Sequence, residues 1–153
     1  MFILDFSLEN FPNVGSLIMH PGSGEFEARI KLSDTLARPL YLSVKVSIRY
    51  NGAINIKVFA PYWIVNKTGL PLLFRQDNEK AEAAGQFEEH ELARMVAPLL
   101  FSFAERDSNL SLLARVGVGL HEGGRPSWCK NFYVQTGSKV RRLRVASPAH
   151  NNR

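Results

Sequence analysis

Residues 60–76 read APYWIVNKTGLPLLFRQ, and this stretch decides the expected fold of the chain. Tyr62 to Val65 is an aromatic and β-branched run, which suits a pleated, half-buried strand. Asn66-Lys67-Thr68-Gly69 places Asn first and Gly last, as in a type I β-turn. We expect Leu70 to Phe74 to be the returning strand. Pro71 has no N–H, so this strand must lie at a sheet edge or begin just after the proline.

A second strong signal lies upstream, where apolar and polar residues alternate from Leu40 to Tyr50 and again from Ile54 to Val58. This period-two pattern indicates a hairpin with one wet face. A two-residue Asn-Gly loop would pair Ile48 with Asn55 and set core side chains against solvent-facing ones. A three-residue loop ending at Gly52 pairs Ile48 with Ile54 instead. The sequence therefore predicts a G1 bulge with Gly52 at positive φ.

The rest of the chain also predicts strands. Phe26 to Leu32 alternates apolar and charged residues, and further strands are expected at residues 2–8, 14–19, 99–104, 110–118, 128–135 and 139–145. Residues 77–96 hold much of the acid of the chain and are interpreted as a polar excursion with a short helix around 88–95. Residues 147–153 are expected to be a disordered tail.

Composition limits the class of protein. The chain has 153 residues, 45% of them hydrophobic and 22% charged, which fits one globular domain. No apolar run approaches the roughly 20 residues needed to span a bilayer, and we expect no secretory signal. Cys129 is the single cysteine, which excludes an internal disulfide and fits a reducing compartment. The net charge of +5 allows weak attraction to anionic lipid or nucleic acid.

Sequence patterns for catalysis or metal binding are missing. The histidines are widely spread, and neither His90 nor His121 begins a His-Glu-x-x-His pattern. Cys129 has no recognisable nucleophile context. The sequence contains no P-loop, no Gly-x-Gly-x-x-Gly and no Gly-x-Ser-x-Gly. We therefore expect a protein that is not an enzyme, with no catalytic residues, no cofactor and no metal.

The stretch 60–76 closely resembles a signature of the vacuolar protein sorting-associated protein 13 family of bridge-like lipid transfer proteins. It is similar to part of their adaptor-binding region, a series of all-β repeats. Looser matches continue in Ala37-Arg38-Pro39-Leu40, Glu82-Ala83-Ala84-Gly85-Gln86, Glu88-Glu89-His90-Glu91, Pro98 to Phe103 and Pro126-Ser127-Trp128. The resemblance implies an all-β fold of antiparallel, β-sandwich-like repeats. Residues 1–146 would form one all-β region with the signature repeat at about 36–128, and residues 77–96 an irregular connection.

The resemblance also implies a function. It implies a non-catalytic protein-interaction module that recruits bridge-like lipid transfer proteins to organelle membranes by binding Pro-x-Pro motifs of adaptors. The expected partners are adaptor proteins with Pro-rich motifs and neighbouring repeats of a larger chain, with no nucleic acid. The expected location is cytoplasmic, peripheral at organelle membranes or contact sites. Because repeats depend on their neighbours for burial, we expect the isolated chain to be marginally stable or to self-associate.

Asn66 is the leading candidate site residue. In the resembling family, repeats carry a characteristic Asn at this kind of position, and Asn66 matches by its place in the motif. Two roles stay open: its side chain satisfies backbone groups of the turn that ends at Gly69, or it contacts an adaptor peptide. Tyr62 and Trp63, with Trp128, form either an aromatic platform for a polyproline II peptide or part of the core.

A basic run near the end of the chain supports the alternative function, a peripheral membrane-binding β module. Its members are Lys139, Arg141, Arg142 and Arg144. On a strand, these residues would be divided between two faces, as on a solvated edge strand. As a contact with an anionic membrane, each basic residue would contribute about 1 kcal/mol.

Overall fold

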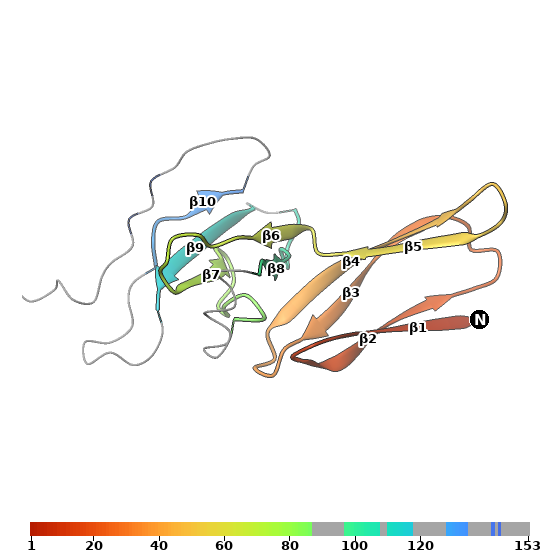
Figure 1. Cartoon of the computed structure of the whole chain (residues 1–153), viewed down its shortest axis with the longest axis horizontal. Coiled ribbons are helices and arrows are strands. Elements are labelled where there is room, and N and C mark those ends of the chain that lie inside the picture. The colour runs from red at the N-terminus through yellow and green to blue at the C-terminus, as the bar shows by residue number, and fades with distance from the viewer. Residues whose placement is uncertain (87–96, 108–109, 118–127, 135–141, 143, 145–153) are drawn as a thin grey trace, which may run out of the picture.

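The structure, a computed structural model, describes residues 1–86, 97–107, 110–117, 128–134, 142 and 144. These residues contain ten strands and no helix, and every strand pair is antiparallel (Figure 1). The prediction of an all-β, antiparallel fold is confirmed. The strands are β1 (Phe2–Leu8), β2 (Phe11–Met19), β3 (Phe26–Ser33), β4 (Pro39–Ile48), β5 (Ile54–Phe59), β6 (Tyr62–Ile64), β7 (Leu72–Gln76), β8 (Leu99–Phe101), β9 (Ser111–Val116) and β10 (Phe132–Tyr133).

Strands β1 to β5 form an N-terminal lobe of two layers. The β1–β2 hairpin packs against the β3–β4–β5 sheet, and side chains of both layers share one core. Leu32, Val44 and Val46 lie at the centre of this core and are at most 2% exposed. Gly15 of β2 permits the close approach of the layers, because a Cβ at this position would lie 3.0 Å from Cδ2 of Leu32.

The β4–β5 hairpin has the predicted register. Ile48 pairs with Ile54, Val46 with Ile56 and Val44 with Val58. Gly52 has φ +82° and its N–H donates to the carbonyl of Arg49 at 2.8 Å. The three-residue loop with a G1 bulge is therefore confirmed, and the apolar faces of both strands point to the same side.

Strands β6 to β10 form a C-terminal lobe, also of two layers. Tyr62, Ile64, Leu99 and Phe101 of the β6–β8 pair face the β10–β9–β7 sheet, which contributes Phe74, Leu112 and Ala114. Cys129 is buried against β9. Its N–H donates to the carbonyl of Ala114 at 2.8 Å, and its Sγ accepts a hydrogen bond from the N–H of Ala114 at 3.2 Å.

The expected hairpin between β6 and β7 is wrong. β6 pairs with β8, and β7 pairs with β9 in the opposite layer. The loop between β6 and β7 carries the chain from one layer to the other, so the two strands cannot share a ladder. The expectation for Pro71 is confirmed, because β7 begins at Leu72 and is the outermost strand of its sheet within the described residues.

Other strand boundaries differ in detail. β2 begins at Phe11, three residues earlier than expected, because Asn10 turns tightly with φ +67° and lets Phe11 pair with Leu8. β8 and β10 are shorter than expected. The proposed helix at 88–95, the tail 147–153 and most of the expected strand at 139–145 lie outside the described residues. Arg142 and Arg144 are described, and neither lies in a strand.

Candidate functional site

Asn66 holds the loop between β6 and β7 with its side chain. Its Oδ1 accepts hydrogen bonds from the N–H of Thr68 at 3.0 Å and from the Oγ1 of Thr68 at 2.7 Å. Its Nδ2 donates to the carbonyl of Leu70 at 2.7 Å. Gly69 completes the loop with φ +74°, which a glycine adopts without a Cβ penalty. The amide of Asn66 thus provides both an acceptor and a donor, as expected of a residue that structures this turn.

Tyr62 and Trp63 point to opposite faces of β6. The ring of Tyr62 packs edge-on against Phe103 with centroids 5.2 Å apart, inside the lobe. Trp63 lies on the outer face and is 66% exposed, so the interpretation of Trp63 as a core residue is wrong. Because strand side chains alternate, the buried Tyr62 necessarily turns its neighbour outward.

Trp128 is far from this outer face. Its ring lies 4.6 Å from the guanidinium carbon of Arg75 and 5.1 Å from that of Arg115. Arg75 and Arg115 lie on the face of the β10–β9–β7 sheet that points away from β6 and β8, because Phe74 and Ala114 face inward. The structure therefore does not bring Trp63 and Trp128 into one aromatic platform.

The exposed surface around Trp63 is apolar. Val65 and Leu70, at the two ends of the Asn66 loop, are 55% and 51% exposed. This surface, consisting of Trp63, Val65 and Leu70, is called the Trp63 surface below. Its backbone support comes from the pairing of Trp63 with Leu100 and from the hydrogen bonds of Asn66.

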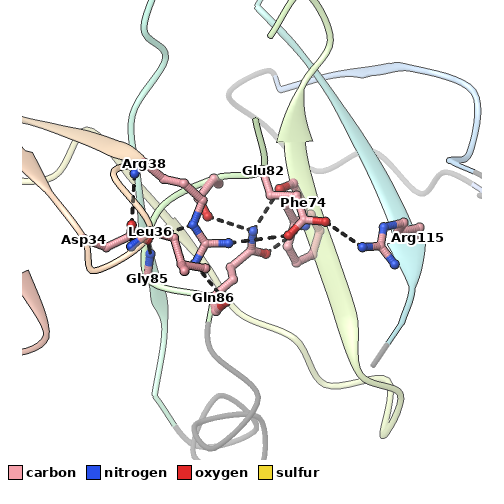
Figure 2. Close-up of polar contacts among 9 residues, drawn as sticks. Asp34, Leu36, Arg38, Phe74, Glu82, Gly85, Gln86 and Arg115 are labelled. Atoms are coloured by element: carbon pink, nitrogen blue, oxygen red, sulfur yellow. Dashed lines mark hydrogen bonds and ion pairs between the residues drawn. The ribbon is translucent and has the colours of Figure 1, made fainter. Parts of the chain in front are cut away.

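Five polar side chains join the two lobes and are called the polar junction: Asp34, Arg38, Glu82, Gln86 and Arg115 (Figure 2). Nε of Arg38 donates to Oδ2 of Asp34 at 2.8 Å, and Nη2 of Arg38 donates to the carbonyl of Gln86 at 2.9 Å. Oε2 of Glu82 lies 3.4 Å from Nη1 of Arg38, and Oε1 of Glu82 accepts from Nη2 of Arg115 at 2.5 Å. One carboxylate thus serves two buried guanidinium groups, one from each lobe.

Asp34 is the most enclosed member of the polar junction. Burial alone would raise the pKa of its carboxyl group, but hydrogen bonds from the N–H groups of Gly85 and Arg38 and from the Arg38 guanidinium outweigh burial. The pKa of Asp34 therefore lies below its usual value. The carboxylate also accepts from the N–H of Leu36 at 2.9 Å, so it fixes the turn between β3 and β4 as well.

Gln86 of the polar junction takes the place of a neighbouring strand beside β7. Its Oε1 accepts from the N–H of Phe74 at 2.7 Å, and its Nε2 donates to the carbonyl of Phe74 at 2.9 Å. Nε2 also donates to the carbonyl of Ala83 at 2.9 Å. At this position the N–H and carbonyl on the outer edge of β7 are thus hydrogen-bonded to a side chain. They are not available for pairing with another chain.

Arg29 makes a second link between the lobes. Its Nη2 donates to the carbonyl of Phe103 at 2.6 Å, and its guanidinium carbon lies 4.2 Å from the ring centre of Tyr41. Burial lowers the pKa of Arg29, and the nearby positive charge of Arg106 lowers it further. This contact ties β3 to the segment after β8.

Sequence reasoning did not find the polar junction. The composition of residues 77–96 predicts a polar excursion, yet Glu82 and Gln86 from this segment bind buried groups. Their only distinguishing signal was that they, like Arg38, fall within motifs that resemble the family. Composition alone cannot separate a polar residue that faces solvent from one that bridges two lobes.

The basic run is only partly described. Arg142 and Arg144 are exposed, while Lys139 and Arg141 lie outside the described residues. The predicted division of these four residues between two strand faces therefore stays a prediction.

These features define the class of protein: an all-β module that presents a hydrogen-bonded loop and an exposed apolar surface. Among the described residues, no group of three His, Cys, Asp or Glu side chains is placed to hold a metal ion. In the same part of the chain, no helix has the length and hydrophobicity to cross a membrane.

The chain belongs to the vacuolar-sorting associated protein 13 family, because the family model of its adaptor binding domain matches residues 1–153. The resemblance identified from residues 60–76 is confirmed. The human intermembrane lipid transfer protein VPS13D is 48% identical over 142 residues, which cover 93% of this chain and 3% of the relative. Vps13D of Drosophila melanogaster is 39% identical over 143 residues, covering 93% of this chain and 4% of the relative.

A shorter match joins 31% of this chain to 1% of the intermembrane lipid transfer protein tipC of Dictyostelium discoideum, at 40% identity. The chain thus spans only a few per cent of the length of these curated relatives. No solved structure matches the chain.

Proposed function

We propose that this chain is a non-catalytic module that binds Pro-x-Pro motifs of adaptor proteins, and that it acts peripherally in the cytoplasm at organelle membranes or contact sites. The family assignment as an adaptor binding domain is the observation that carries this proposal. The relatives are named as intermembrane lipid transfer proteins, so the recruited activity would be lipid transfer by a longer chain. The other expected partners are neighbouring repeats.

The Trp63 surface is the proposed contact for the peptide. Polyproline II segments dock on exposed aromatic rings. The peptide helix is already formed before binding, so little conformational entropy is lost. Trp63 provides such a ring, and Val65 and Leu70 extend the apolar contact. The loop held by Asn66 and Gly69 keeps these side chains in place. Tyr62 supports the surface from inside the lobe.

The test is a two-dimensional amide NMR titration of the whole chain with a Pro-x-Pro peptide. We expect resonances of residues 63–70 to shift, and Trp63→Ala to weaken binding at least about tenfold, as for an interface anchor. Tyr133→Ala is the matched control, because Tyr133 is 43% exposed on the other layer of the same lobe. Unshifted resonances at residues 63–70, or equal loss in both variants, would refute the proposed contact.

A second candidate function is contact between the basic run and an anionic membrane. The exposure of Arg142 and Arg144 favours it. The expected result is binding to phosphatidylserine vesicles that is lost at high salt and in a variant with Gln at Arg141, Arg142 and Arg144. Binding that survives these three substitutions would rule out the basic run as the contact.

A further inference from the structure

Exposed apolar side chains gather at one end of the N-terminal lobe, which we call the apical end. It carries the β4–β5 turn and the free end of the β1–β2 hairpin, and it lies opposite the C-terminal lobe (Figure 1). The large exposed apolar residues at this end are Met1, Phe2, Ile3, Ile18, Ile48, Tyr50 and Ile54. Single exposed apolar residues are ordinary, but a group at one projecting end marks an interaction surface.

Tyr50 lies in the turn between β4 and β5, and its side chain is fully exposed. The turn around it is closed without its ring. The N–H of Arg49 donates to the carbonyl of Ala53 at 2.8 Å, and Oδ1 of Asn51 accepts from the N–H of Ala53 at 3.1 Å. Ile48 and Ile54 flank the turn as a direct cross-strand pair, and both are about half exposed. The hydrogen-bonded turn thus presents an apolar tip, and the ring of Tyr50 is not needed to close the turn.

The β4–β5 hairpin, which carries this tip, has charges of one sign. Residues 44–58 contain Lys45, Arg49 and Lys57 and no acidic residue. Lys45 and Lys57 face each other directly across β4 and β5, an arrangement that costs stability in a sheet. Lys45 has a carboxylate partner in Glu27 at 3.1 Å, on the far side from Lys57. Glu25, which is also at this end, accepts a hydrogen bond from the N–H of Ile48.

We propose that the apical end binds the surface of an anionic lipid bilayer. Tyr50, Ile48 and Ile54 enter the interfacial region, where amphipathic aromatic rings are favoured, and Arg49 and Lys57 bind the headgroups. A second copy of this chain is a poorer occupant, because pairing two tips would bring the like charges of Arg49 and Lys57 together. This contact differs from the basic run near the end of the chain and does not depend on adaptor binding.

The test is co-sedimentation of the full chain with vesicles of phosphatidylcholine alone or mixed with phosphatidylserine. We expect binding only to the mixed vesicles. The double variant Arg49→Gln, Lys57→Gln should weaken it roughly thirtyfold, since each basic residue near a charged leaflet contributes about fivefold. Tyr50→Ala should weaken it without lowering the melting temperature, because the ring contacts nothing that the fold needs.

Lys80→Gln with Lys130→Gln is the matched control, as it removes the same charge from exposed positions outside both the apical end and the basic run. We expect this control to bind like the unmodified chain. Absence of binding to the mixed vesicles, unchanged binding by the tip variants, or equal loss in the control would each overturn the proposal.

A Tyr50→Trp variant provides a second measurement, made in a Trp63→Phe, Trp128→Phe background so that the added Trp is the only one that fluoresces. A shift of its fluorescence to shorter wavelength on adding the mixed vesicles, but not phosphatidylcholine alone, is the expected result. If the added Trp is unaffected by vesicles while sedimentation shows dimers that Tyr50→Ala abolishes, the apical end binds a second copy instead and the proposal is wrong.

Discussion

At the scale of single residues, side-chain amides and carboxylates form hydrogen bonds with backbone groups, bonds that are usually formed by other backbone groups. Asn66 closes the loop between β6 and β7, and Asp34 accepts hydrogen bonds from the backbone of the turn between β3 and β4. Gln86 forms hydrogen bonds with the edge of β7 where a neighbouring strand would otherwise pair. Each of these side chains satisfies backbone groups that would otherwise need water or a neighbouring strand. Such positions tolerate few substitutions, because another residue type must reproduce both the shape and the direction of the hydrogen bonds.

Asn66→Ser should destabilise the chain by about 1–2 kcal/mol, because serine is too short to reach the carbonyl of Leu70. The measurement is thermal unfolding followed by circular dichroism. Asn51→Ser is the matched control: Asn51 also lies in a loop but accepts one bond, from Ala53, so the loss should be smaller. An unchanged melting temperature for Asn66→Ser would show that its bonds do not stabilise the fold.

The lowered pKa of Asp34 predicts an acid-dependent loss of stability. A carboxyl whose pKa is lower in the folded state stabilises the fold above its unfolded pKa of about 3.9, and this contribution is lost as pH falls through the folded pKa. Asp34→Asn should therefore reduce the free energy of unfolding near pH 7 by on the order of 3 kcal/mol.

The same substitution should flatten the acid limb of the curve of unfolding free energy against pH, measured by urea titration. Asp5→Asn, at an exposed strand position where the carboxylate accepts one hydrogen bond from Ser16, is the control and should reduce the free energy of unfolding near pH 7 less than Asp34→Asn does. Parallel acid limbs for the unmodified chain and Asp34→Asn would contradict the role given to this carboxyl.

At the scale of elements, the alternation of apolar and polar residues predicted the existence of most strands. It even predicted the register of β4 and β5, because only one register puts apolar residues on the same face. It could not predict that Tyr62 pairs with Phe101 rather than with a residue of β7, since pairing across a long loop leaves no local pattern. The exposure of Trp63 depends on that pairing, so the sequence pattern could not predict it either.

The edge of β7 gives a prediction at this scale. Gln86→Met keeps the approximate shape but removes the acceptor for the N–H of Phe74, which should cost about 1–3 kcal/mol. Hydrogen exchange of the Phe74 amide should accelerate relative to that of Ala114 in β9, whose own partner is Cys129. Equal protection of the Phe74 amide before and after the substitution would exclude Gln86 as its partner.

At the scale of the whole molecule, the two lobes share no continuous sheet in the described residues. They are joined by polar contacts and by Leu100 of β8, which packs against the N-terminal core. Glu82 touches Arg38 from one lobe and Arg115 from the other, and Arg29 adds a separate link to Phe103. Sequence patterns predicted the adaptor-binding family but not this joint, because contacts between lobes depend on the final packing.

Glu82→Gln should weaken the joint, because it removes the carboxylate that pairs with the buried guanidinium of Arg115 and one of the two carboxylates that pair with Arg38. We expect a loss of about 3 kcal/mol or more. In a Trp63→Phe background, the fluorescence of Trp128 should also change, since Arg115 lies against its ring. Glu79→Gln is the control, as Glu79 makes no ion pair with a described residue. Unchanged fluorescence and stability in Glu82→Gln would contradict the shared role of this carboxylate.

The burial of Cys129 has a kinetic consequence. Its thiol is the only one in the chain and is enclosed where it contacts Ala114 of β9. A thiol-reactive dye can modify it only during moments when this contact opens, so the labelling rate measures how often the C-terminal lobe opens in its native state. The labelling rate of Cys129 therefore reports local opening without any substitution in the chain. It can be compared before and after a partner binds.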